Sequence, residues 1–477
     1  MIYLFIKFLP YILVMYFLYR TLKDPIFLMG IPFLMFLRSS IFFESVEIFR
    51  IPFRSIESID RNPDITLLVW MIIFWIIFRI RSENYPMLNN KNKIDIKSFS
   101  ILDYSIVGLI VITVVGFGMV LKEYVVLDQV YDKFIVLLSL FVGFWIIRDT
   151  CSRVEINVLD KFLYNIVLVN SLASGLYFIH QGLHISIYSS ATNEYLVTFF
   201  EGQVITRTFW FMPVLWFFSI SYLLAMRRKK TIIDILLIGI NILGIYISYT
   251  RSFLMIAILI FFVYFLLIGY KEKSLGNSIK NLLLGSIAAI AVFVAVSSFL
   301  PASTNYFLSR FKELEDQPAT VQSNNLVYRF YKTERVIDRM NTSKRLFGYG
   351  SVTEKQNPFV KVVDGATADM GWAEVVFRWG FIGLVLFVLL YIGSMIKAFF
   401  LFLRTDGLVS QLSLMLLLTI ISQVIEGFTS YTIMSPSRFA MALWYFGILS
   451  ALLMVYGKKE KNIITESDMK ESYKTDV

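Results

Sequence analysis

The chain has 477 residues, of which 57% are hydrophobic and 17% aromatic, and its mean hydropathy is +0.68. Soluble domains average about 45–50% apolar residues, so this composition excludes an ordinary soluble protein and indicates a polytopic membrane protein. The formal net charge of +10 could suggest a nucleic-acid partner, but the lysines and arginines fall between apolar runs, where membrane topology requires them, and we expect no such partner. The single cysteine, Cys151, excludes an internal disulfide and a cysteine metal cluster.

Apolar runs long enough to cross a bilayer recur along the chain. A spanning helix needs about 20 apolar residues. Candidate runs lie near 2–19, 25–43, 64–80, 101–121, 134–147, 161–179, 209–226, 231–249, 252–270, 281–300, 372–396, 408–428 and 439–457. We therefore expect an all-α polytopic membrane protein with about thirteen transmembrane helices, about ten of them within 1–300 and three within 372–457. The first run lacks a small-residue cleavage site, which favours a retained helix over a signal peptide.

The basic residues predict the orientation of these helices. The loops around 20–24, 79–100, 148–161, 227–230, 271–280 and 397–404, together with the tail 458–477, hold 24 lysines and arginines. The short loops on the opposite side hold about eight. By the positive-inside rule, the first set of loops and the tail are expected to be cytoplasmic.

Residues 301–371 break the pattern of short connections. This segment joins two predicted spans on the outer side, and loops of such length are usually functional or disordered. The stretch LVYRFYKTERVIDRM at 326–340 has apolar residues near helical spacing, which predicts a short helix over the mouth of the protein. The following LFGYG at 346–350 is expected to form a turn, because its two glycines permit unusual backbone angles.

Three arginines on the predicted outer side are candidates for ligand contacts. Arg251, in ISYTRSFLM, stands between two apolar runs with almost no loop; it is either an interfacial anchor that snorkels to the surface or a binding residue. Arg329, in NNLVYRFYK, is by itself an ordinary charge on a helix surface. Arg207, in VITRTFWF, stands at a span entrance, where anchor and ligand-binding readings are equally open.

The stretch TADMGWAEVVFRWGFIGL at 367–384 places charges at the start of an apolar span. An ionised side chain at the bilayer centre costs at least ~2.5–3.5 kcal/mol, so such residues are rare and usually functional. Glu374 and Arg378 are four residues apart and can pair on one helix face, which is a sufficient structural reason for both. Asp369 could cap the helix N-terminus.

Taken together, these charges predict a site for an anionic, pyrophosphate-linked ligand. The planar fork of an arginine matches phosphate oxygens and stays charged, and a nearby carboxylate suits activation of a hydroxyl nucleophile. The sequence contains no Asp-x-Asp motif and no GxxxxGK[ST] motif, the signatures of metal-dependent nucleotide-sugar transferases and of P-loop ATPases. His180 and His184 could hold a metal but lack an obvious third ligand, so we expect no metal or other cofactor.

Three of these features, in order, resemble the bacterial O-antigen polymerase and O-antigen ligase group of lipid-linked glycan transferases. The first is an Arg between two spans, here in YTRS at 249–252. The second is an Arg opening the external-loop helix, here Arg329 after Tyr328. The third is the Leu-x-Gly-x-Gly turn at 346–350. The resemblance covers roughly residues 200–450 and includes an Arg at a span entrance, here Arg207.

A fourth match is a polar residue eleven positions before a Gly that is followed by Gly-Leu, here Asp369, Gly380, Gly383 and Leu384. The ligase branch has His at the polar position, whereas Asp369 with Gly371 resembles the Asp-x-Gly form of capsule and exopolysaccharide polymerases. The glutamate often found just before Gly380 is replaced here by Arg378-Trp379, which leaves the role of Arg378 open.

The resemblance implies the membrane glycosyltransferase (GT-C) architecture and polymerisation of undecaprenyl-diphosphate-linked repeat units outside a bacterial plasma membrane. Asp369, Arg251 and Arg329 would then be catalytic. The remaining substrate contacts would come from Arg207, Arg378, Glu374, Tyr328, Arg335 and Tyr349. Expected partners are the lipid-linked oligosaccharides, membrane lipids and a chain-length regulator protein. Two alternatives stay open: a ligase of the same group, and a flippase, although a transporter would be expected to show paired halves.

Overall fold

The computed structural model describes residues 16, 19–21, 23–31, 63–81, 100–123, 128–183, 195–200, 203–208, 213–226, 230–301, 304–309, 331, 334, 337–338, 340, 342–350, 371–429 and 436–456. Its elements, in chain order, are η1 (Pro25–Met29), α4 (Pro63–Arg81), α5 (Ile101–Glu123), α6 (Asp128–Arg153), α7 (Ile156–Tyr177), η5 (Phe178–Gly182), β1 (Tyr195–Phe200), β2 (Gln203–Thr208), α8 (Pro213–Met226), α9 (Ile232–Ile247), α10 (Arg251–Lys271), α11 (Leu275–Phe299), α14 (Thr342–Phe347), α16 (Gly371–Arg404), α17 (Gly407–Thr429) and α18 (Pro436–Tyr456).

The described part of the chain is helical, as expected, with one exception. Strands β1 and β2 form an antiparallel hairpin in which Tyr195 pairs with Thr208 and Phe200 with Gln203. The all-α expectation did not include this hairpin. It occupies part of the outer loop predicted before α8.

Four described helices are long and apolar enough to cross a membrane: Ile101–Met119, Arg251–Lys271, Gly371–Arg404 and Gly407–Phe428. Shorter apolar helices cover Val69–Ile80, Leu215–Met226, Ile232–Ile247 and Met441–Tyr456. The full count of about thirteen spans stays a prediction. The runs at 2–19 and most of 25–43, the tail 458–477, and most of the predicted helix 326–340 lie outside the described residues.

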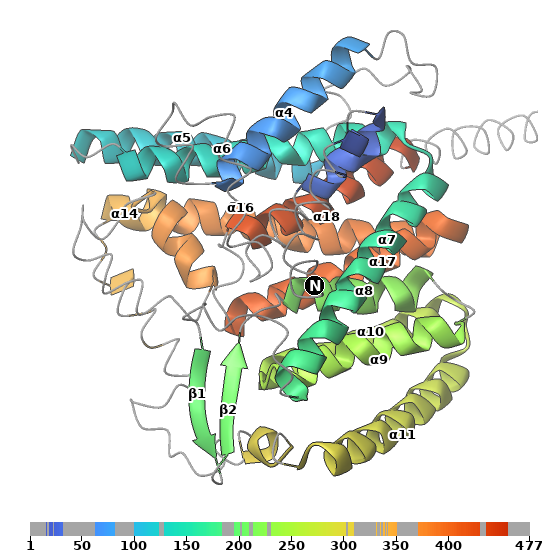
Figure 1. Ribbon diagram of the computed structural model, residues 1–477. Coiled ribbons are helices and arrows are strands. Elements are labelled where there is room, and N and C mark those ends of the chain that lie inside the picture. The colour runs from blue at the N-terminus through green and yellow to red at the C-terminus, as the bar shows by residue number, and fades with distance from the viewer. Residues whose placement is uncertain are drawn as a thin grey trace, which may run out of the picture.

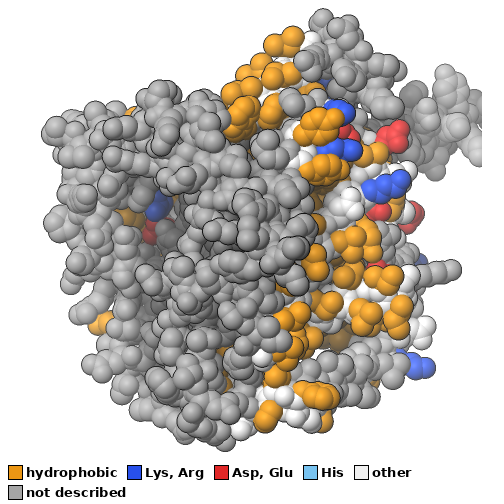
Figure 2. Space-filling model, viewed as in Figure 1, with side chains coloured by type: hydrophobic (Ala, Val, Ile, Leu, Met, Phe, Trp, Pro, Cys, Tyr) orange, Lys and Arg blue, Asp and Glu red, His pale blue; other side chains and the backbone are white. Residues whose placement is uncertain are grey.

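Helices α5, α6, α16 and α18 run roughly parallel to one another, whereas α4 and α7 cross the view at a steep angle (Figure 1). α16 lies between α5 and α17, α18 packs on α6, and α17 also contacts α8. Large aromatic side chains fill the contacts, for example Phe218 of α8 between Trp444 and Tyr445 of α18. Hydrophobic side chains also form a broad exposed band on the face drawn in Figure 2. Exposed apolar surface of this extent requires a non-aqueous environment, which fits a multi-pass membrane protein.

Hydrogen bonds between α7, α8 and α9 form a buried polar layer. The Asn170 side-chain amide donates to the Leu215 carbonyl, to Ser219 Oγ and to the Asn241 side-chain oxygen at 2.8–3.1 Å. Trp216 Nε1 donates to Ser174 Oγ at 2.8 Å. Such bonds are typical of helix association in lipid, where apolar surface alone gives little preference for one partner.

Ion pairs collect at one end of the bundle. Arg148 near the end of α6 pairs with Asp103 at the start of α5 (2.7 Å), and both are at least 95% buried. Ser450, near the end of α18, donates to the same carboxylate. Lys271 at the end of α10 bonds to the Phe402 carbonyl of α16 and to Ser410 Oγ of α17. These contacts bring together, at one end of the bundle, helix termini that are connected in sequence to the basic loops.

We expect the Asp103→Asn substitution to destabilise the protein by about 3–5 kcal/mol, because it leaves the Arg148 charge buried without its ion-pair partner. Thermal unfolding of the purified protein in detergent measures the effect. The double variant Asp103→Asn with Arg148→Met should recover much of the loss, because no buried charge remains. A double variant less stable than the single one would contradict this account.

Candidate active site

Two glycine-containing motifs, separated by about 30 residues in sequence, meet at the other end of the bundle. α14 ends at Phe347, and the turn 348–350 that follows it lies against the first half of α16. Tyr349 N–H donates to the Phe377 carbonyl at 2.8 Å, and Gly350 N–H donates to the Arg378 carbonyl at 2.9 Å. Figure 1 shows α14 beside the ends of α5 and α16. Two backbone–backbone hydrogen bonds thus hold the turn on the helix.

Gly380 is the reason that these two carbonyls can accept bonds from the turn. It has φ 65° and ψ −167° within α16, so the helix is broken at this residue. In a continuous α-helix each carbonyl accepts from the N–H four residues ahead, and the break removes those donors from Phe377 and Arg378. The turn supplies replacement donors, which avoids the ~1–3 kcal/mol cost of each buried carbonyl left without a partner.

The glycines of both motifs are required by space as well as by backbone angle. A Cβ atom added to Gly348 (φ 74°) would lie 2.3 Å from the Arg378 carbonyl, and one added to Gly380 would lie 2.2 Å from the Leu346 carbonyl oxygen. Gly348 directly follows the last residue of α14, and its N–H donates to the Lys344 carbonyl at 2.7 Å. A glycine in the left-handed region is the usual residue just past a helix C-terminus.

Charged and aromatic side chains surround this junction. Glu374 is 1% exposed and forms an ion pair with Arg378, as the four-residue spacing predicted. The ring of Tyr349 stacks on Phe377 at 5.0 Å, and the Lys344 ammonium lies 5.2 Å from the Tyr349 ring centre. Lys344 and Arg378 together outweigh the charge of Glu374, so the junction as described carries a net positive charge.

A small crevice opens at this junction between α5 and α6. Arg378, Trp379 and Gly350 line one side of it, and Ile112 and Phe117 line the other. Trp379 is fixed by a hydrogen bond from its Nε1 to Thr113 Oγ1 at 2.9 Å. The crevice therefore combines apolar walls with one guanidinium, an arrangement suited to an amphipathic anionic ligand.

Arg345 orders the chain that leads into α14. Its guanidinium donates to the backbone carbonyls of Ile337, Met340 and Asp338 at 2.9–3.1 Å. Together with Lys344 it precedes the Leu-x-Gly-x-Gly turn directly, and sequence reasoning overlooked both residues. Their position next to a recognised motif was the available signal.

Arg251 is the first residue of α10 and follows a tight turn, as its sequence context predicted. Within this turn Tyr249 has φ 51°, which is unfavourable for a residue with a side chain. The ring of Tyr249 is buried against Tyr306 at 5.1 Å, and Tyr246 hydroxyl bonds to Thr304 Oγ1 at 2.6 Å. Nη1 of Arg251 is inaccessible to solvent. Segment 304–309 thus holds in place the turn from which Arg251 projects.

Glu426 in α17 is a buried carboxylate that sequence reasoning missed. It is 1% exposed and lies close enough to Tyr391 and Tyr445 to interact with both electrostatically. One turn away, the Gln423 amide is 4% exposed and makes no hydrogen bond to any described residue. The rule that drew attention to Glu374, an acid inside an apolar span, would have found Glu426 in LLLTIISQVIEGF as well.

The end of α17 stands at about the same depth as Arg251. Lys271, at the far end of α10, bonds to Ser410 Oγ near the start of α17, and the two helices pack along each other. Each residue advances a helix by about 1.5 Å, so equal distances along the two helices bring Arg251 level with the last turns of α17. By the same count, Glu426 lies about one helical turn deeper in the bundle than Arg251.

The structure brings together only part of the predicted site. Tyr349, Glu374 and Arg378 meet at the α14–α16 junction, whereas Arg251 starts a separate helix and Arg207 lies in β2, opposite Leu196. Four of the predicted site residues lie outside the described part of the chain: Tyr328, Arg329, Arg335 and Asp369.

The predicted histidine pair is only half described. His180 lies in the π-helix η5, and His184 falls outside the described residues. Among the described residues, no group of three histidine, cysteine or acidic side chains is placed to hold a metal ion.

A protein-family model described as O-antigen ligase matches residues 236–388. The chain thus carries an O-antigen ligase family domain, which confirms the resemblance read from the motifs. The matched part includes Arg251, the turn at 346–350, Asp369 and Gly380. No curated protein matches the chain.

We expect the Gly380→Ala substitution to detach the turn from α16. The left-handed backbone costs an alanine roughly 1–2 kcal/mol, and its Cβ would collide with the Leu346 carbonyl. Trypsin should then cleave faster after Lys344, which is 4% exposed in the intact protein.

Gly239→Ala is the matched control, because Gly239 lies within α9 and a Cβ there meets nothing within 4 Å. It should leave both the cleavage rate and the unfolding temperature near those of the original protein. Equal cleavage rates in the two variants would show that Gly380 does not hold the turn.

Proposed function

From the O-antigen ligase family domain at residues 236–388, we propose that this protein is a metal-independent polymerase of lipid-linked oligosaccharide repeat units. The donor is the growing glycan on undecaprenyl diphosphate, and the acceptor is the next lipid-linked unit. A hydroxyl of the acceptor attacks the anomeric carbon of the donor. The bond from that carbon to the diphosphate oxygen breaks, the hydroxyl loses its proton, and undecaprenyl diphosphate leaves.

The observation that carries this proposal is the docking of the Leu-x-Gly-x-Gly turn on Gly380. Two of the motifs that gave the resemblance are parts of one rigid junction, held by the bonds from Tyr349 and Gly350 to α16. A third, the Arg of YTRS, follows a strained and buried turn at Tyr249. Strained backbone of this kind collects at functional sites. The motifs therefore have specific structural roles.

Arginines would hold the donor diphosphate and stabilise it as it leaves. At about 4 Å and an effective dielectric near 20, one arginine–phosphate pair gains on the order of 4 kcal/mol before desolvation costs. Arg251 is a suitable first contact because part of its guanidinium is shielded from water, which strengthens its interactions. Arg329 and Arg207 would complete the diphosphate site, with Arg378, Tyr328, Arg335 and Tyr349 in contact with the substrates.

Asp369 would accept or orient the proton of the acceptor hydroxyl. General-base help of this kind typically contributes a factor of about 10²–10⁴ in rate. Asp369 stands two residues before Gly371, where α16 begins. Glu374 forms an ion pair with Arg378, which leaves it less suited to act as the base.

The proposed site faces the outside of a bacterial plasma membrane. The ion pairs of Arg148 and Lys271 lie at the end of the bundle opposite to α14. By the positive-inside rule, this end would be cytoplasmic, because the basic loops follow these helix ends in sequence. Segment 301–371 would cover the site, and grooves between spans would take the prenyl tails. A chain-length regulator would be the protein partner.

A ligase of the same family is the second candidate, because the matching family model is described as O-antigen ligase. It would move finished glycan to a different acceptor. The polar residue of the last motif is Asp369 instead of the His of the ligase branch, which favours the polymerase. A flippase is the third candidate, but no internal repeat is visible in the sequence.

We expect Arg251→Ala, Arg329→Ala and Asp369→Asn to leave expression intact while the glycan stays at one repeat unit. Arg251→Lys should restore only part of the activity, because it keeps the charge but loses the bidentate fork. Product length on a gel is the measurement. Arg404→Ala, at the exposed opposite end of α16, is the control and should produce full-length polymer. Full-length polymer from Arg251→Ala would refute the mechanism.

Purified protein in detergent should extend a lipid-linked repeat unit into a ladder of longer products. A transporter forms no glycosidic bond, so it would leave the single unit unchanged. In cells, an inactive ligase would accumulate long lipid-linked chains, whereas an inactive polymerase would accumulate single units. Long chains in cells carrying Asp369→Asn would therefore favour the ligase.

A further inference from the structure

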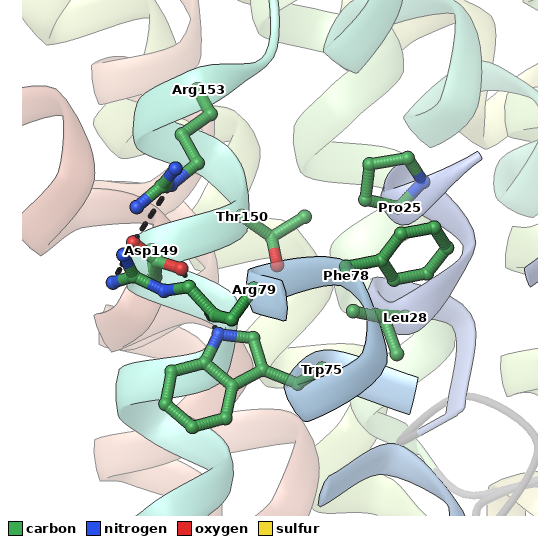
Figure 3. Close-up of a pocket in the computed structure, with 8 residues that line it drawn as sticks. All are labelled: Pro25, Leu28, Trp75, Phe78, Arg79, Asp149, Thr150 and Arg153. Carbon is green, nitrogen blue, oxygen red and sulfur yellow. Dashed lines mark hydrogen bonds and ion pairs between the residues drawn. The ribbon is translucent and has the colours of Figure 1, made fainter. Parts of the chain in front are cut away.

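A small open pocket lies at the end of the bundle opposite to the candidate active site. It is formed by η1, the last turns of α4 and the end of α6. Figure 3 shows Arg79 and Arg153 on either side of Asp149, with Trp75 beneath them and Pro25 and Leu28 opposite. The proposed reaction uses none of these residues.

The pocket carries more positive than negative charge. Asp149 is 7% exposed, and its carboxylate accepts from Arg79 Nη2 at 2.8 Å, from Arg153 Nε at 2.9 Å and from Trp75 Nε1 at 3.0 Å. Two guanidinium groups thus share one carboxylate, which leaves a net charge of about +1 in the lining. The Arg79 side chain is 31% exposed, so its charge reaches the opening of the pocket.

The rim of this pocket is apolar and faces outward. On α4, Ile76 and Ile80 flank Arg79 in sequence and are 44% and 72% exposed. Figure 2 shows basic and acidic side chains next to one another among exposed hydrophobic ones in the region of η1 and α4. An arginine with an apolar surface on one side and an open polar pocket on the other is suited to the level at which lipid tails end and headgroups begin.

We infer that this pocket binds the phosphate headgroup of an anionic membrane phospholipid. The guanidinium groups of Arg79 and Arg153 contact the phosphate oxygens, and Trp75 and Phe78 border the glycerol part of the headgroup. The acyl chains lie along the exposed stripe of Ile76 and Ile80. Basic pockets between spans on the cytoplasmic side are known to take anionic headgroups, and Arg is the side chain best matched to phosphate geometry.

The ion pairs of Asp149 also join α4 to α6, and a purely structural role predicts different behaviour. If the ion pairs only hold α4 on α6, the stability of the protein depends on the number of ion pairs and does not change with the charge of added lipid. A headgroup site depends on the excess positive charge. Neutralising Asp149 therefore separates the two, because it weakens these ion pairs and raises the positive charge of the pocket.

The test uses the full-length protein in neutral detergent, with phosphatidylglycerol or phosphatidylcholine added, and native mass spectrometry to count retained lipids. Phosphatidylglycerol should be retained and should raise the unfolding temperature, whereas phosphatidylcholine should do neither. Arg79→Gln should weaken phosphatidylglycerol binding about fivefold, the factor that corresponds to ~1 kcal/mol for one basic residue near a membrane surface. Asp149→Asn should lower the basal unfolding temperature and yet bind phosphatidylglycerol more tightly.

Arg404→Gln is the matched control, since Arg404 is an exposed arginine at the same end of the bundle, outside this pocket. It should retain phosphatidylglycerol like the original protein. An equal loss in Arg404→Gln and Arg79→Gln, or weaker binding in Asp149→Asn, would overturn the inference.

Two further arms identify the source of the phosphate. Inorganic phosphate at millimolar concentration should not reproduce the stabilisation; if it does, the pocket binds free anions and the lipid assignment is wrong. Undecaprenyl diphosphate should not displace phosphatidylglycerol from the original protein. If it does, and if Arg79→Gln weakens that displacement, the pocket is a second binding site for the polyprenyl carrier lipid. These outcomes do not depend on the polymerase activity, so they can fail while the proposed function holds.

Discussion

The backbone contact between the turn at 348–350 and α16 is the constraint on which the candidate site depends. Gly380 breaks the helix and leaves two carbonyls without their helical donors. The N–H groups of Tyr349 and Gly350 donate hydrogen bonds to these carbonyls. Neither partner is stable alone, because an open helix break inside an apolar bundle would leave polar groups without bonds. The turn at 348–350 is therefore positioned by α16 itself, which fixes Arg378 and Glu374 relative to the turn.

Charged groups in the bundle are balanced in some places and in excess in others. At the basic end, the buried Asp103 is matched by Arg148, Asp149 is shared by two arginines, and Lys271 caps the carbonyls at the end of α16. At the other end, Lys344 and Arg378 outnumber Glu374, and Arg251 starts a helix beside a strained turn. Matched charges support helix packing, whereas an excess of positive charge in a partly apolar site requires an anionic partner. Such an excess occurs both at the α14 end and in the pocket around Asp149, and an anionic ligand is proposed for each.

The sites at the two ends would contact one bilayer from opposite sides. The proposed polymerase would bind a polyprenyl diphosphate at the α14 end, and the pocket around Asp149 would bind an anionic headgroup at the opposite end. Both sites rely on arginine next to an apolar surface, because both ligands combine phosphate with hydrocarbon. α16 and α6 run the length of the bundle and give the two sites a common rigid scaffold.

The sequence by itself determined the class of protein and most helix positions. A long apolar run in lipid must satisfy its backbone hydrogen bonds within itself, and a helix does so. The predicted runs 101–121, 252–270 and 408–428 lie within two residues of α5, α10 and α17. It also determined the Glu374–Arg378 pair, since four-residue spacing is a local property of a helix. Only the tertiary structure decided that Phe377 and Arg378 would accept bonds from the turn and that Asp103 would meet Arg148. Those relations depend on which helix neighbours which, and periodicity along one chain carries no information about its neighbours.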